Sequence, residues 1–267
     1  MSCGHDHEKE EMNGMKPENT GERSPEVKEA AGTSSPRSAG AAGTSPLRPT
    51  GAAGKRIFLV RHGETSWNRE GRFQGQIDVP LNDAGLRQAD AVAEALKDVP
   101  FDRIISSNLS RALRTALPLA SRMRMGMGVE TDDDLQEIGH GLWEGRTAAE
   151  VETMYPGALA LWHTRPETVV MPEGESLADV QRRAWPALLR IAEGKGETVA
   201  VFTHDAVLKV LLMKALDCPL SSFWRFQLAN GSITLLELGN KGWRIPLMGE
   251  AGHLGSVFGK RAEQKGL

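Results

Sequence analysis

The chain has 267 residues, only 2 cysteines and a formal net charge of −3 at pH 7. This length allows one or two domains, and the charge gives no electrostatic reason to expect nucleic acid or an anionic membrane as a partner. Cys3 and Cys218 lie far apart in unlike contexts, so no disulfide framework is indicated. No stretch resembles a signal peptide or a membrane span, and we therefore expect a cytoplasmic protein.

Residues 1–54 differ in composition from the rest of the chain. They contain no Phe, Trp, Tyr or Ile and are dense in Gly, Ala, Ser, Thr, Pro and charge. Such a segment cannot bury enough apolar surface to offset the entropy of ordering it. We predict a disordered tail over 1–54, one folded domain over 55–254 and a flexible tail over 255–267. Cys3, His5 and His7 could ligate zinc or copper. No second group of ligands accompanies this cluster, however, and we predict no metal site.

The first predicted element is a short buried strand over Ile57–Val60, which runs directly into Arg61-His62-Gly63. The polar stretch from Thr65 onward has the character of a helix start. In open α/β sheets ligands bind at the carboxyl ends of the strands. An arginine beside a histidine there indicates chemistry on an anion, although such a pair is also common at a solvated corner.

The same order of strand, loop and helix follows. Residues 71–81 predict an irregular loop, and Asn82 or Asp83 caps a helix that ends near Pro100. A second strand is expected over 101–105. Ser110 then begins a helix with Arg111 in its first turn, where a guanidinium and backbone N–H groups together can bind an anion.

A third strand is expected over 128–131, followed by an acidic loop from which Glu137 stands apart because an ordered-looking turn follows it. Short helices are predicted over 147–154 and 158–163, and 165–175 predicts a loop over the site. Ser176, with Asp179 three positions later, opens a long amphipathic helix that stops at Gly194.

The clearest buried strand is Thr198–Phe202, which ends in Thr203-His204-Asp205 before another helix. Two further strands, over 232–238 and 243–247, can pair antiparallel at the sheet edge. Strands that alternate with amphipathic helices predict an α/β fold with three layers, in which helices cover both faces of a mainly parallel sheet.

A parallel sheet would bring Arg61, His62, Arg111, Glu137 and His204 to one rim. The cations could bind a phosphate dianion and neutralise the charge of a phosphoryl-transfer transition state without a metal ion. One histidine could attack phosphorus, and a protonated carboxyl group could donate to the leaving oxygen. Each residue also has a structural alternative: Arg111 as a helix-surface residue, for example, and Glu137 as part of the acidic loop.

These residues resemble the Arg-His-Gly motif and related motifs of the histidine phosphatase superfamily, which includes the cofactor-dependent phosphoglycerate mutases. The matches follow the family order and span 55–254: Arg61-His62-Gly63-Glu64-Thr65, Phe73-Gln74-Gly75, Ser107-x-Leu109-x-Arg111-Ala112, Glu137 with Gly141-x-Trp143-Glu144-Gly145, Gly174-Glu175-Ser176 and Thr203-His204-Asp205.

The resemblance implies a role for each matching residue. His62 would become the phosphohistidine, and Glu137 would act as the general acid and then as the base that activates water. Arg61, Arg111 and His204 would hold the phosphoryl group. The substrate-binding residues implied in addition are Asn68, Gln74 and Gly75. Asp205 departs from the family, where many members have Gly, and could pair with a nearby cation or disfavour an anionic substrate tail.

Other polar and aromatic residues have simpler interpretations. We expect His140 and His163 to be structural, and Glu144 to brace its turn or pair with an arginine. Trp143, Trp162, Trp185 and Phe223-Trp224 are expected to be packing residues, although Trp162 and His163 could touch substrate from a cap over the pocket.

Three functions fit these motifs. A phosphomonoester hydrolase of the small-phosphatase branch, similar to α-ribazole and broad-specificity phosphatases, is favoured because the longer insert of the mutases after Glu137 is missing here. A phosphoglycerate mutase is the alternative. A decayed phosphate-binding module would have lost a catalytic residue, and none is lost.

We expect no cofactor, a small phosphorylated metabolite as partner, no nucleic acid or membrane partner, and a monomer or homodimer. Specificity is expected to depend on 146–175 and the surroundings of Gln74.

Overall fold

The computed structural model describes residues 54–123 and 127–255. The predicted tails, 1–54 and 255–267, lie outside these ranges except for Gly54 and Gly255. The tails and the domain limits 55–254 therefore stay predictions. No helix among the described residues has the length and apolar character that crossing a membrane requires.

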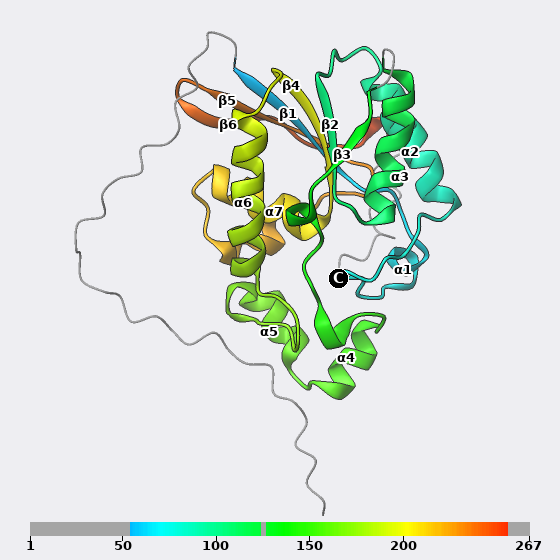
Figure 1. The fold of residues 1–267 in the computed structure, drawn as a ribbon. Helices are drawn as coiled ribbons and strands as arrows, with labels where there is room; N and C mark the ends of the chain where they lie inside the picture. Colours follow the sequence, from blue (N-terminus) through cyan, green and yellow to red (C-terminus); the bar gives the residue numbers. More distant parts are fainter. Residues whose placement is uncertain (1–53, 124–126, 256–267) are drawn as a thin grey trace, which may run out of the picture.

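One sheet of six strands forms the centre of the described structure (Figure 1). The strands are β1 (Lys55–Arg61), β2 (Arg103–Ser106), β3 (Val129–Thr131), β4 (Thr198–Thr203), β5 (Ile233–Gly239) and β6 (Gly242–Glu250). Their spatial order is β3-β2-β4-β1-β5-β6. The first four are parallel to one another, whereas β5 pairs antiparallel with β1 and β6 antiparallel with β5. The predicted mainly parallel sheet and the antiparallel final pair are confirmed.

Helices cover both faces of the sheet. Helices α2 (Asp83–Leu96) and α3 (Ser110–Arg122) pack on one face, and α6 (Leu177–Glu193) and α7 (Asp205–Ala215) on the other. In β1, Val60 belongs to the apolar core with α2 and α3, whereas Leu59 belongs to the core with α6 and α7. Successive side chains of a strand point to opposite faces. A strand covered on both faces therefore needs an unbroken apolar run, as found at 57–60.

Short helices lie beyond the carboxyl ends of the parallel strands (Figure 1). They are α1 (Ser66–Glu70), α4 (Ala148–Met154) and α5 (Ala158–Thr164). Five short 3₁₀-helices complete the helices of the described residues: η1 (Asp133–Leu135), η2 (Gly141–Trp143), η3 (Pro166–Thr168), η4 (Leu220–Arg225) and η5 (Gly252–Leu254).

The predicted helix starts are confirmed by their caps. The Asn82 side chain accepts a hydrogen bond from the Gly85 N–H at 2.8 Å, and Ser176 and Asp179 form a capping box at the start of α6. Helix α2 ends at Leu96, earlier than expected, because hydrogen-bonded turns occupy the chain as far as Phe101. Strand β2 correspondingly begins at Arg103.

Two glycines hold the turn after β1 against α2. A Cβ atom at Gly63 would lie 2.6 Å from the carbonyl oxygen of Gly85, and a Cβ at Gly85 would lie 2.1 Å from the carbonyl oxygen of Glu64. Neither position has room for a side chain. This close approach sets the path of the backbone directly after His62.

Candidate active site

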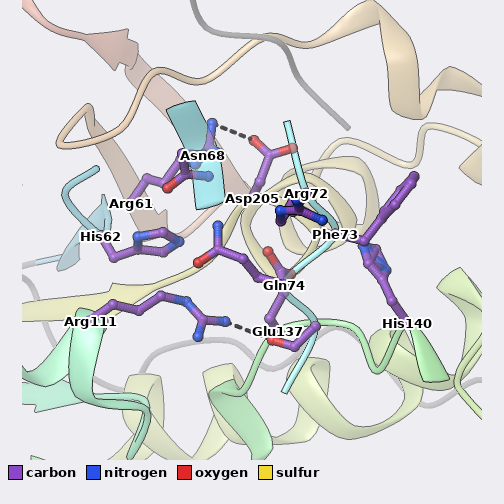
Figure 2. Close-up of a pocket in the computed structure, with 11 residues that line it drawn as sticks. Arg61, His62, Asn68, Arg72, Phe73, Gln74, Arg111, Glu137, His140 and Asp205 are labelled. Atoms are coloured by element: carbon purple, nitrogen blue, oxygen red, sulfur yellow. Dashed lines mark hydrogen bonds and ion pairs between the residues drawn. The ribbon is translucent and has the colours of Figure 1, made fainter. Parts of the chain in front are cut away.

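The carboxyl ends of the parallel strands bring the predicted catalytic side chains together. Arg61 ends β1 and His62 follows it, Arg111 lies in the first turn of α3 after β2, Glu137 follows β3, and His204 follows β4. All of them except His204 line one pocket at this edge (Figure 2). The pocket is lined by Arg61, His62, Asn68, Arg72, Phe73, Gln74, Gly75, Arg111, Glu137, His140 and Asp205.

His62 is held in one tautomer. Its Nδ1 lies 2.7 Å from the carbonyl oxygen of Gly63. A carbonyl oxygen only accepts, so Nδ1 carries the proton and Nε2 keeps its lone pair. Burial, followed by the nearby charges of Arg111 and Arg61, holds the pKa of His62 well below its ordinary value. The imidazole is therefore neutral at neutral pH, as a nucleophile must be.

Two guanidinium groups flank this imidazole (Figure 2). Arg111 is fully buried and donates through Nη1 to the Ile77 carbonyl at 2.9 Å and through Nη2 to the Gly75 carbonyl at 2.7 Å. Arg61 donates through Nη1 to the Leu228 carbonyl. Within the described ranges, the buried Nε atoms of both arginines have no hydrogen-bond partner. Burial lowers the pKa of Arg111 to about 10, so it remains a cation at neutral pH.

His204 packs against His62, with ring centroids 5.1 Å apart, and is fully buried. Its Nε2 lies 2.9 Å from the Ser107 hydroxyl, and its Nδ1 has no hydrogen-bond partner among residues 54–123 and 127–255. Burial and then Arg111 lower the pKa of His204 well below its ordinary value. His204 lies with the predicted site residues, but its contact with a phosphoryl group stays a prediction.

Glu137 is positioned at the start of α7. Its Oε1 accepts hydrogen bonds from the backbone N–H of Ile138 at 3.0 Å and of Ala206 at 3.2 Å. Burial, followed by the negative charge of Asp205, raises the pKa of Glu137. A raised pKa favours the protonated carboxyl group, which can donate a proton.

The predicted substrate-binding residues of the loop also line the pocket. The amide oxygens of Asn68 and Gln74 are used within the protein, because they accept from Thr65 N at 3.1 Å and from Thr65 Oγ1 at 2.9 Å. Their NH₂ groups are thus the parts suited to an anion. Gly75 holds Arg111 through its carbonyl oxygen, and its φ of +55° and a Cβ that would lie 1.8 Å from Glu144 Oε1 require glycine.

A sequence model of the histidine phosphatase superfamily (branch 1) matches residues 57–251. The chain belongs to this superfamily. Three comparisons support the membership. The chain is 36% identical over 204 residues to a metal-independent phosphoserine phosphatase of Arabidopsis thaliana. The alignment covers 75% of this chain and 84% of that protein. It is 34% identical over 209 residues to a probable phosphoglycerate mutase, GpmB, of Proteus mirabilis. This alignment covers 76% of this chain and 96% of that protein. The solved structure of Bacillus stearothermophilus YhfR matches with a TM-score of 0.71 and 34% identity, over 75% of this chain and 99% of that chain.

Three pocket residues of this histidine phosphatase were not predicted as site residues: Arg72, Phe73 and His140. His140, expected to be purely structural, is buried edge-on against Phe73, with ring centroids 5.0 Å apart, and lines the pocket. Burial and then Arg111 lower its pKa to about 3. Its position three residues after Glu137, and the position of Arg72 and Phe73 directly before Gln74, are the sequence signals that could have identified them.

Asp205 also lines the pocket and pairs with cations, as one of the two alternatives predicted. Its Oδ1 lies 3.4 Å from Arg61 Nη1, and its Oδ2 lies 2.7 Å from Lys209 Nζ. Although burial alone would raise it, Lys209 and then Arg61 hold the pKa of Asp205 below its ordinary value. The Asp205 carboxylate is thus balanced by two positive charges.

Several other predictions can be placed. Glu144 braces its turn, because its Oε1 accepts from the backbone N–H of Gln76 at 2.9 Å and of His140 at 3.0 Å. Trp162 is buried against Phe223, as predicted for a packing residue, and neither it nor His163 lines the pocket. No residue of 146–175 lines this pocket either, and its share in specificity stays a prediction. The Cys3-His5-His7 cluster lies outside the described residues.

Proposed function

We propose that this protein hydrolyses the phosphomonoester of a small phosphorylated metabolite through a phosphohistidine at His62, without a metal ion. One observation carries the proposal. The His62 imidazole, with its proton fixed on Nδ1 by the Gly63 carbonyl, lies between the guanidinium groups of Arg61 and Arg111 (Figure 2). A neutral nucleophile between two cations suits attack on a phosphate dianion.

The remaining side chains have distinct roles in this reaction. Arg61 and Arg111 bind the equatorial oxygens and neutralise their charge, as a metal ion does in other phosphoryl-transfer enzymes. His204 donates a further hydrogen bond from beside His62. The amide groups of Asn68 and Gln74 extend the donor set at the pocket wall.

Glu137 acts first as an acid and then as a base. As the bond from His62 Nε2 to phosphorus forms, the bond to the leaving oxygen breaks, and that oxygen takes the Glu137 proton. Water then gives a proton to the Glu137 carboxylate and attacks phosphorus. This step releases inorganic phosphate and restores both side chains.

The substrate class is supported by the relatives. The Arabidopsis relative is named a phosphoserine phosphatase, which makes phosphoserine the first substrate to test. Phosphosugars, phosphoglycerate derivatives and nucleotide-linked phosphates belong in the same panel. The cytoplasmic setting and the monomeric or homodimeric state stay predictions.

Phosphoglycerate mutase is the second candidate, because the Proteus relative carries that name. A mutase returns the phosphoryl group to a reoriented substrate instead of to water. Incubation with 3-phosphoglycerate separates the two functions: a hydrolase releases inorganic phosphate, and a mutase forms 2-phosphoglycerate.

Replacement of the nucleophile tests the proposed chemistry. We expect His62→Ala to lower turnover of p-nitrophenyl phosphate by at least about 10³-fold and to abolish acid-labile phosphoenzyme. His163→Ala, at an exposed position of α5, is the matched control and should keep both. Unchanged turnover in His62→Ala would contradict the assignment.

Chelation tests metal independence separately. Because Arg61 and Arg111 supply the positive charge at the pocket, excess EDTA should change kcat by less than about twofold. The measurement compares rates before and after dialysis against chelator. A large loss of rate that added Mg²⁺, Mn²⁺ or Zn²⁺ reverses would show that a metal ion takes part.

A further inference from the structure

An ion pair outside the pocket contacts the backbone of the segment that carries Glu137. Arg183, on α6, and Glu175 form a bidentate pair, with Nε 2.8 Å from Oε1 and Nη2 2.9 Å from Oε2. The two side chains are only 18% and 23% exposed. Neither residue lines the pocket. Glu175 belongs to the Gly174-Glu175-Ser176 motif, to which the proposed reaction assigns no role.

Arg183 holds the backbone immediately before and at Glu137. Its Nη1 donates to the carbonyl oxygens of Asp134 at 2.8 Å and Gln136 at 2.7 Å, and its Nη2 donates to the carbonyl oxygen of Glu137 itself at 2.8 Å. A planar guanidinium fixes the direction of all these bonds at once. The peptide groups on this side of Glu137 therefore cannot turn independently of α6.

Glu175 holds the backbone on the other side of Glu137. Its Oε2 accepts a hydrogen bond from the Gly139 N–H at 2.8 Å, and its own N–H donates to the Gly139 carbonyl at 2.8 Å. Gln76 adds a bond from its Nε2 to the Glu137 carbonyl at 3.2 Å. The segment is thus fixed both before and after Glu137, while the Glu137 carboxyl group itself accepts from the backbone N–H groups of Ile138 and Ala206.

We propose that Arg183 and Glu175 are positioning residues that hold the general acid Glu137 at the leaving oxygen. The inference rests on the proposed function, which makes Glu137 the proton donor. Apart from the Gln76 side chain, whose Nε2 lies 3.4 Å from Glu175 Oε2, the pair's contacts beyond its own ion pair are with the backbone around Glu137, so it acts by fixing where the carboxyl group lies. A displacement of about 1 Å can cost about 10²-fold in rate.

The dependence of the rate on the leaving group separates this role from general support of the fold. Benzyl phosphate releases a strongly basic alkoxide unless an acid protonates it, whereas p-nitrophenyl phosphate, of similar size, releases a weakly basic phenolate. A misplaced acid therefore slows the first substrate more than the second. The parameter to measure is kcat/KM, because it covers the steps up to phosphoenzyme formation.

The variants are Arg183→Met and Glu175→Gln, with Arg182→Met as the matched control. Arg182 is the neighbouring arginine on α6, 74% exposed and paired with Asp179. We expect Arg183→Met to lower kcat/KM for benzyl phosphate by about 10- to 100-fold and for p-nitrophenyl phosphate by less than about threefold. Glu175→Gln should show the same selectivity with smaller losses, and Arg182→Met should change neither value.

Glu137→Gln separates failure of the inference from failure of the proposed function. If Glu137→Gln slows both substrates equally, the acid assignment itself is wrong. If Glu137→Gln is selective and the Arg183 and Glu175 variants slow both substrates equally, or neither, the pair only supports the fold and the inference is overturned. Adding Arg183→Met to Glu137→Gln should cause no further loss on benzyl phosphate. Should Arg183→Met not fold, Arg183→Lys, which keeps the charge but cannot reach all the carbonyls, decides by the same ratio.

Discussion

Lys209 shows how the pocket wall accommodates the Asp205 carboxylate. Lys209 on α7 is 3% exposed. Its ammonium group lies 2.7 Å from Asp205 Oδ2 and over the rings of Phe223 and Trp224, at 4.6 and 5.0 Å from their centroids. A buried charge is stable only when it is paired. Arg61 therefore does not have to neutralise Asp205 alone and can hold an anion as well.

Removal of this lysine should be costly. Lys209→Met keeps the packing volume but leaves Asp205 with Arg61 as its cation at the pocket wall. We expect the free energy of unfolding, measured in urea at pH 7, to fall by about 3 kcal/mol, as for other buried pairs that lose one partner. The double variant Lys209→Met with Asp205→Asn is the control and should recover part of this loss. A single variant as stable as the parent would show that the pair contributes nothing.

At the scale of the elements, the local pattern of apolar residues and caps was sufficient to predict the fold and the sheet edge at which the candidate site lies. The run Ile57–Val60, the cap at Asn82 and the capping box at Ser176 all depend on residues within a few positions of one another. Strand ends then place the predicted catalytic residues without any long-range information.

The pocket wall depends on contacts that no local pattern contains. The Gly75 carbonyl accepts from Arg111, and the Glu144 carboxylate accepts from the Gln76 N–H, in each case across tens of positions of chain. Arg72 likewise donates through Nη1 to the Gly145 carbonyl at 2.8 Å, 73 positions away in the chain. The ion pair of Arg183 with Glu175 was missed because it binds backbone carbonyl and N–H groups, which every sequence possesses.

At the scale of the whole molecule, the site contains several buried histidines that are neutral in the folded state. The pKa values of His62, His140 and His204 are all lowered, in each case chiefly by burial. In the unfolded chain a histidine titrates near pH 6.5. Below that pH the unfolded state binds protons that the folded state does not, so the free energy of unfolding falls as the pH falls. For His140 this window extends down to about pH 3.

Glu137 acts in the opposite direction. Its pKa is raised, so its contribution to stability is complete below its unfolded pKa and is lost as the pH rises through the folded value. Asp205, with a lowered pKa, contributes stability above its unfolded pKa and loses it as the pH falls through the folded value. Between pH 6.5 and 5 the stability lost through the three histidines exceeds the stability gained through Glu137. Acidification should therefore destabilise the protein.

We therefore expect the free energy of unfolding to fall between pH 7 and 5.5 by about 1 kcal/mol for each buried histidine, less the opposing contribution of Glu137. Urea unfolding in a phosphate-free buffer measures this, because bound phosphate would stabilise the folded state by mass action. His140→Gln should remove about one third of the histidine contribution, and His163→Gln, at an exposed position, should leave the pH dependence as it was. A stability that stays constant or rises between these two pH values would contradict the buried, neutral state of all three imidazoles and, with it, the neutral nucleophile on which the proposed reaction depends.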